Sequence, residues 1–97
     1  MATTEATSSN GRMVPGLYFV QAFGGKGKAS GRDFGRVTVV SVKEDGEAEV
    51  IDMWCDRVVA ERARRDFEFP DAVAIDTEQR TFQGQLRAQL VAVRPAS

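Results

Sequence analysis

The chain has 97 residues and is 42% apolar, which suits one small domain with a modest core. Its formal net charge is only -1. It has one cysteine and no histidine, which excludes an intramolecular disulfide and argues against a transition-metal site and against His-based nucleophilic catalysis. No apolar stretch is long enough for a secretory signal or a membrane span, so we expect a soluble, cytoplasmic protein without cofactor or enzymatic activity.

The first elements are a tail and a strand. Residues 1–13 are rich in Thr, Ser and Ala and cannot bury enough surface to fold, so we expect a disordered tail before a single domain over residues 14–97. β-branched and aromatic residues predict a strand over residues 17–23. The dipeptide Pro15-Gly16 prevents an earlier start.

The middle of the chain predicts a hairpin followed by a helix. Strands over residues 36–42 and 47–55 flank a turn that contains Asp45-Gly46, a pair typical of tight hairpins. Residues 56–66 predict a short helix with Asp56 as N-cap and an Arg57 to Glu61 ion pair. Alternating residues then predict a fourth strand over 71–78 and a fifth over 85–93.

This order, three strands, a helix and two strands, predicts a mainly β fold. Five strands with one helix between the third and the fourth are typical of the Greek-key oligonucleotide/oligosaccharide-binding (OB) barrel. The binding surface of that barrel includes strands two and three and the loops that join strands one to two and four to five.

Basic and aromatic residues gather in the connections that become those two loops, residues 24–36 and 79–84. Lys and Arg outnumber Asp and Glu by 5 to 2 over residues 1–36 and by 3 to 0 over residues 79–97. Over residues 37–78 the balance is reversed, with 5 Lys and Arg against 12 Asp and Glu. If the fold joins the two positive flanks, they form a basic, aromatic face suited to a polyanion with stackable bases.

Short motifs add a family resemblance. The stretch Val50-Ile51-Asp52-Met53-Trp54 before a short helix resembles the third strand and helix of bacterial single-stranded-DNA-binding proteins, and residues 80–87 resemble the hairpin that follows in them. Residues 82–96 are similar to the ending of the small single-stranded-DNA-binding proteins of filamentous phages. The chain ends at Ser97 without the long acidic tail of the bacterial proteins, so we expect a phage, plasmid or replication-accessory version.

Ten residues are candidates for contact with nucleic acid. Lysine and arginine side chains would follow the phosphates, and aromatic rings would stack on bases. Trp54 could equally close the core, and the first basic loop could be a merely solvated hairpin loop. A nucleotide-binding P-loop is not indicated, because Gly27-Lys28 precedes Ala29 and a strand. The candidates are Tyr18, Lys26, Lys28, Arg32, Phe34, Arg36, Trp54, Arg80, Phe82 and Arg87.

The sequence therefore predicts a protein that binds single-stranded DNA, with RNA as a possible ligand, and with little sequence preference. We expect at least a homodimer, because so small a barrel covers few nucleotides. The main alternative is a barrel of the same fold that docks an acidic protein partner. An enzyme could pair Asp52 with Asp76, but isolated carboxylates are usually surface charges.

Overall fold

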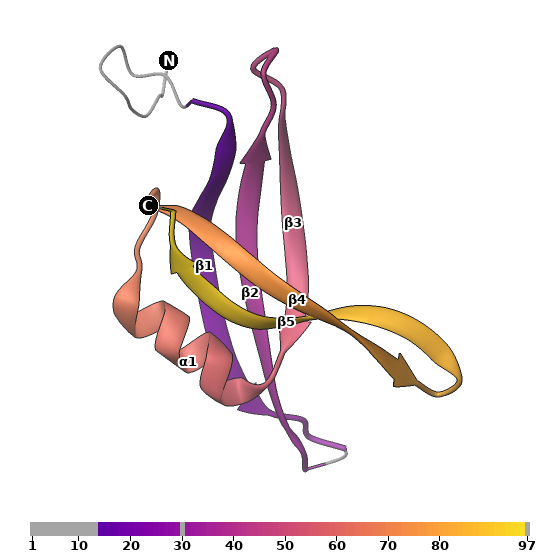
Figure 1. Ribbon diagram of the computed structural model, residues 1–97. Coiled ribbons are helices and arrows are strands. Elements are labelled where there is room, and N and C mark those ends of the chain that lie inside the picture. The colour runs from indigo at the N-terminus through magenta and orange to yellow at the C-terminus, as the bar shows by residue number, and fades with distance from the viewer. Residues whose placement is uncertain (1–13, 30, 97) are drawn as a thin grey trace.

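Five strands and one helix make up the described part of the chain (Figure 1). The computed structural model describes residues 14–29 and 31–96, the side chain of Phe82 excepted, so the predicted tail over 1–13 lies outside it. The elements are β1 (Gly16–Lys26), β2 (Asp33–Val42), β3 (Ala48–Cys55), α1 (Arg57–Asp66), β4 (Ala72–Phe82) and β5 (Gln85–Pro95).

The strands close into a barrel in the order β1-β2-β3-β5-β4. All neighbours are antiparallel except β3 and β5, which run parallel and meet at Cys55 and Leu90. The barrel closes where Leu17 of β1 pairs with Val73 of β4. This strand order, with one helix between β3 and β4, confirms the predicted OB-type Greek-key barrel.

The core follows from the two-residue alternation of the strands. Val37 and Val39 of β2 point inward and are fully buried, together with Leu90 of β5. In β1 the register shifts between Phe19 and Gln21, which marks a β-bulge. Because the extra residue reverses the alternation, β1 turns a different set of side chains outward on each side of the bulge.

Helix α1 packs against a pair of glycines. Gly24 and Gly35 lie opposite each other on β1 and β2. A Cβ atom on Gly35 would come within 2.7 Å of the Asp56 carbonyl oxygen and 2.8 Å of the Ala60 Cβ atom. These glycines lie in paired strands and make room for the helix that covers the lower end of the barrel (Figure 1).

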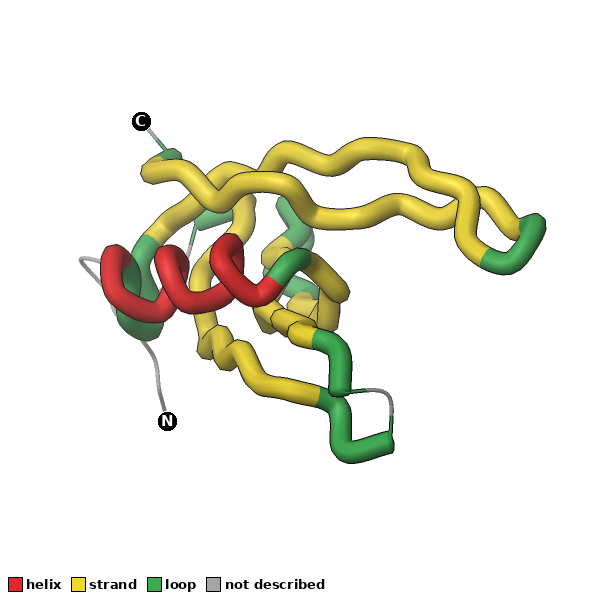
Figure 2. Tube along the Cα trace, turned by 90° about the horizontal axis from the view of Figure 1, so that it is seen from below, coloured by secondary structure: helices red, strands yellow, loops and turns green. Residues whose placement is uncertain are grey.

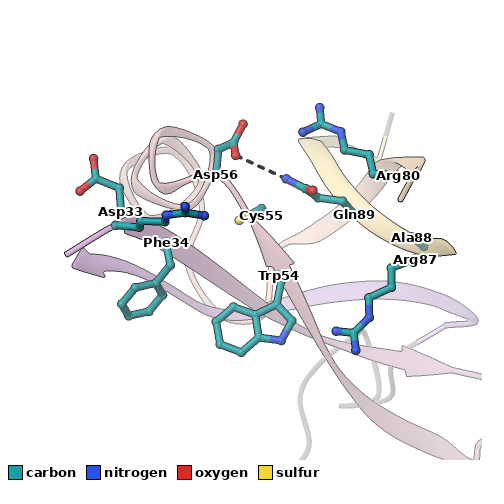
Figure 3. Close-up of a pocket in the computed structure, with 10 residues that line it drawn as sticks. Asp33, Phe34, Trp54, Cys55, Asp56, Arg80, Arg87, Ala88 and Gln89 are labelled. Atoms are coloured by element: carbon teal, nitrogen blue, oxygen red, sulfur yellow. Dashed lines mark hydrogen bonds between the residues drawn. The ribbon is translucent and has the colours of Figure 1, made fainter. Parts of the chain in front are cut away.

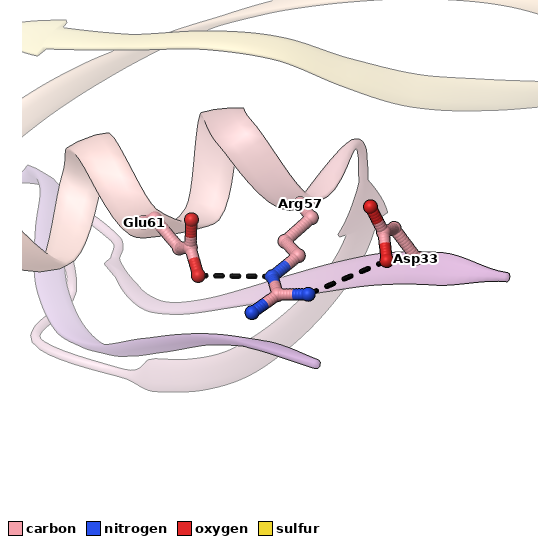
Figure 4. Close-up of polar contacts among 3 residues, drawn as sticks. All are labelled: Asp33, Arg57 and Glu61. Atoms are coloured by element: carbon pink, nitrogen blue, oxygen red, sulfur yellow. Dashed lines mark hydrogen bonds and ion pairs between the residues drawn. The ribbon is translucent and has the colours of Figure 1, made fainter. Parts of the chain in front are cut away.

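Arg57 links the start of α1 to the barrel through an ion pair with Asp33 (Figure 4). Its Nε donates to Glu61 at 2.9 Å, which confirms the predicted pair, and its Nη1 donates to Asp33 of β2 at 3.3 Å. Asp56 occupies the N-cap position as expected, with extended backbone angles, but its side chain makes no capping hydrogen bond. Its carboxylate instead accepts a long, 3.4 Å hydrogen bond from Gln89 of β5.

The β4–β5 hairpin extends well beyond the barrel (Figures 1 and 2). Its outer part, residues 78–89, is called the arm below; there the two strands pair only with each other. The two-residue turn at the tip has positive φ at both Gln83 (53°) and Gly84 (79°), as a type I′ turn requires. Leu86 on the arm is 70% exposed, so the arm adds no core.

Both predicted basic connections are shorter in the structure. Residues 24–26 and 33–36 belong to β1 and β2, so only residues 27–32 connect these strands. Likewise Arg80 lies on β4, and only residues 83–84 form the second connection. The prediction ended β1 and β4 too early and began β2 too late. Glycines usually break strands, and a self-paired arm leaves no pattern of burial in the sequence.

Candidate functional site

Three strands bring an aromatic ring, a guanidinium group and an indole into one row. Arg36 of β2 pairs with Phe23 of β1 on one side and with Trp54 of β3 on the other. Directly opposed residues share a face of the sheet, and the neighbouring Val37 points into the core, so this row lies on the outer face.

The Arg36 guanidinium lies between two aromatic rings. Its Cζ atom is 5.5 Å from the centroid of the Phe23 ring and 5.5 Å from that of the Trp54 ring, within the range of cation–π attraction. Its Nε atom is covered and has no hydrogen-bond partner within the described part of the chain. Among the described residues no carboxylate forms an ion pair with Arg36. The rings therefore hold this cation in place without neutralising it.

Phe34 extends the row into a cluster. Its ring lies edge-on to Phe23 at a centroid distance of 5.9 Å and to Trp54 at 6.0 Å. These four residues, Phe23, Phe34, Arg36 and Trp54, are called the aromatic cluster below. Trp54 is 57% exposed and Phe23 39%. The core position considered for Trp54 is thus excluded, and the expected outward face shared with Asp52 is confirmed.

A cleft of about 930 Å³ lies between the cluster and the arm (Figure 3). Trp54 and Phe34 line it from the barrel, and Arg80 and Arg87 line it from the arm. In Figure 3, Arg87 reaches toward the side on which the Trp54 ring lies, whereas Arg80 points the other way. The cleft thus has an aromatic wall and a cationic wall, drawn from parts of the chain that are far apart in sequence.

The cleft is also lined by Cys55 and Asp56, which follow Trp54 directly in the sequence. Burial of the Cys55 thiol, assisted by the negative charge of Asp56, raises the pKa of that thiol from 9.0 to about 11. The thiol is therefore neutral at ordinary pH and presents neither a nucleophile nor a charge to the cleft.

Three cations lie at the end of β1 and in the connection between β1 and β2. Lys26 pairs in register with Asp33, next to the Gly25–Phe34 pair. Lys26 and Lys28 are exposed, and neither forms an ion pair with another described residue. Arg32 lines the cleft itself. The backbone of the connection is held by hydrogen bonds between Gly27 and Arg32 and between Gly31 and Gly27.

The structure separates the ten predicted residues into groups. Tyr18 is only 8% exposed, and its hydroxyl donates to the Val14 carbonyl at 2.6 Å, so its ring is not presented for stacking. Arg80 forms an ion pair with Glu78 at 2.9 Å. Phe82 ends β4, and its side chain lies outside the described part of the chain, so its stacking role stays a prediction. The remaining residues lie in the aromatic cluster, in the cleft or on the adjoining connection: Lys26, Lys28, Arg32, Phe34, Arg36, Trp54 and Arg87.

Sequence reasoning missed Phe23. Simple alternation places it on the same face as Phe19, which is buried, and so predicts a core position for both. The β-bulge between Phe19 and Gln21 turns Phe23 outward instead, opposite Arg36. The sequence holds no sure signal of that bulge.

The two carboxylates considered for catalysis have separate partners. Asp52 accepts a hydrogen bond from the Thr38 hydroxyl at 2.6 Å. Asp76 accepts two from Arg94, at 2.8 and 2.9 Å, and this bonding lowers the pKa of Asp76 below its ordinary value. Within residues 14–29 and 31–96, no three His, Cys, Asp or Glu side chains gather as metal ligands, and no helix is both long and apolar enough to cross a bilayer.

Comparison with protein-family models, with curated proteins and with solved structures finds no match to this chain.

Proposed function

We propose that the protein binds single-stranded nucleic acid, DNA above all, with little sequence preference, as a cytoplasmic accessory of phage, plasmid or cellular replication or recombination. The observation that carries the proposal is the aromatic cluster: three rings on an outer sheet face around a guanidinium that has no acidic partner among the described residues.

Exposed rings of this kind suit unpaired bases. In a duplex the base faces are already stacked on one another, whereas in a single strand they are open to stack on Trp54 or on Phe34. Such stacking contributes about 1–3 kcal/mol per base and favours no base strongly, since every base has a π-face. An outer sheet face of aromatic residues is therefore a physical basis for binding without strict sequence preference.

Cations on both sides of the cluster suit the phosphates of the same strand. Lys26, Lys28 and Arg32 lie on the β1–β2 side, and the arm brings Arg80 and Arg87 to the opposite wall of the cleft. A strand whose bases lie on the cluster would keep its backbone within reach of these groups. Because Lys and Arg contact phosphates irrespective of sequence, they add affinity and salt dependence without selectivity.

The proposal is tested by fluorescence anisotropy of a labelled single-stranded dT oligonucleotide, with a duplex and an RNA strand of the same length as competitors. We expect the single strands to compete and the duplex to compete poorly. Trp54→Ala should weaken binding by about 1–3 kcal/mol, which is the loss of one stacked base.

Phe69→Ala is the matched control for Trp54→Ala. Phe69 is an aromatic residue of similar exposure, 56% against 57%, and it belongs neither to the aromatic cluster nor to the lining of the cleft. The control should bind like the wild type. If the protein ignored all nucleic acids but bound labelled poly-glutamate, the alternative of an acidic protein partner would replace this proposal.

A further inference from the structure

A carboxylate lies next to the aromatic cluster on the same outer face. Thr38 of β2 pairs with Asp52 of β3, two positions along from the Arg36–Trp54 pair and therefore next to it on the same face. Residues two apart on a strand share a face, so Asp52 and Trp54 project on the same side of β3. The nucleic acid proposed above would cross both rows.

The Thr38 hydroxyl fixes the orientation of this carboxylate. Thr38 is 6% exposed, and its Oγ1 donates to Asp52 Oδ1 at 2.6 Å, whereas Asp52 itself is exposed. An ionised carboxylate accepts about four hydrogen bonds over its two oxygens. One of these positions is occupied by Thr38, and because Asp52 is exposed, the others are open to a ligand.

Such a charge is unfavourable for a surface that only attracts phosphates. Asp52 forms no ion pair with any described residue, so its negative charge is not neutralised within the protein. It would repel a nearby phosphate, whereas it would attract the N–H groups of a base. A polyanion is therefore best accommodated here with a base edge, rather than its backbone, turned toward Asp52.

We propose that Asp52 selects guanine for the nucleotide that lies beside Trp54. The inference rests on the proposed function, and it adds one base-reading position to a surface that otherwise binds all sequences. In a single strand the Watson–Crick edge of each base is open to such contact.

The hydrogen-bond donors and acceptors on the Watson–Crick edges of the bases favour guanine as the partner of a carboxylate. Guanine presents two adjacent donors, N1–H and the N2 amino group, which match the two oxygens of a carboxylate. Adenine and cytosine present one amino group beside a ring nitrogen acceptor, which allows one hydrogen bond and adds repulsion. Thymine and uracil present a single N3–H between two carbonyl oxygens, and those oxygens repel the carboxylate.

The test uses a short labelled dT oligonucleotide and the same strand with one central thymine replaced by guanine. For the wild type we expect the guanine strand to bind about tenfold more tightly, which is the low end of the discrimination of a bidentate base contact. A strand with inosine, which keeps N1–H but lacks the amino group, should lose most of that gain. Asp52→Asn should abolish the guanine preference and leave dT binding equal or tighter, since a negative charge is removed.

Glu49→Gln provides the matched control, because it removes one negative charge from the same strand at a position of the opposite face. The control should retain the tenfold preference. Equal wild-type affinity for the dT and guanine strands, or an unchanged preference in Asp52→Asn, would overturn the role of Asp52 while leaving the proposed function intact. No binding of any single strand would overturn both.

Discussion

Arg80 and Arg87 lie directly opposite each other on the paired strands of the arm. Like charges at directly opposed positions destabilise a sheet. The ion pair of Arg80 with Glu78 offsets part of this repulsion, and the two guanidinium groups diverge at the cleft (Figure 3). This pair places two cations on one wall of the cleft, where an anion could contact them.

Arg87→Gln separates binding from stability at this position. Because Arg87 is an exposed residue of the arm, we expect the free energy of unfolding to change by no more than about 0.5 kcal/mol. Affinity for a single strand should fall, and the slope of log affinity against log salt should flatten by about 0.7. Arg64→Gln, which removes an exposed cation from α1, should leave both binding quantities unchanged. Anisotropy titrations at several salt concentrations and urea denaturation measure these effects.

The only tryptophan reports on the site directly. Trp54 is more than half exposed, so addition of a single strand should quench its fluorescence as a base stacks on the indole. Emission that stays constant at saturation, while anisotropy shows that binding occurs, would place the bases away from Trp54.

Salt dependence tests the contribution of the β1–β2 connection. If about four phosphates are neutralised, the slope of log affinity against log salt should be roughly -3 per chain. Changing Lys26, Lys28 and Arg32 together to Ala should flatten it by about two units and weaken all sequences alike. The helix triple Arg62, Arg64 and Arg65 to Ala is the charge-matched control. Loss of binding in that control, with the first triple unaffected, would move the interface to α1.

The buried thiol makes stability depend on alkaline pH. Burial raises the pKa of Cys55 to about 11 in the folded protein, from the ordinary value of 9.0. The protonated thiol thus favours folding, so its contribution is complete below pH 9.0 and declines as the pH rises toward 11. Urea denaturation across this range should show a steeper decline for the wild type than for Cys55→Ala. Parallel declines would mean that other groups account for the alkaline loss.

Assembly is a separate expectation. Among the described strands, β3 pairs with β2 and meets β5 only at Cys55, so most of its second edge has no described strand beside it. Free edges of this kind are available for pairing with another chain. We therefore expect at least a dimer that uses strand edges. Sedimentation equilibrium decides the matter, and a monomer mass at every protein concentration would contradict it.

The sequence predicts the order of elements because local patterns determine it. Alternating valines mark β2, Asp45-Gly46 marks its hairpin, and Arg57 with Glu61 marks the first turns of α1. The sequence indicates Trp54, Phe34 and Arg36 as candidate contacts, and the structure brings these three side chains together. The row that unites them depends on strand register, which local patterns do not encode.

Two further features escaped prediction for physical reasons. The bulge in β1 reverses the alternation between Phe19 and Phe23, so a ring expected inside lies outside. Gly24 and Gly35 appear as loop residues in the sequence, because their requirement for close packing comes from a helix more than twenty residues further along. Both depend on contacts between segments that are distant in the chain.

The projecting arm divides the backbone into two regimes of amide hydrogen exchange. Strands of the closed barrel open only with the core, whereas residues 78–89 are held by the bonds of a single two-stranded hairpin with water on both sides. Their amides therefore exchange through local opening, at a free-energy cost well below that of global unfolding. A ligand in the cleft would protect the amides in the part of the arm that lines the cleft. The increase in protection would measure how much the bound ligand raises the free energy of opening the arm.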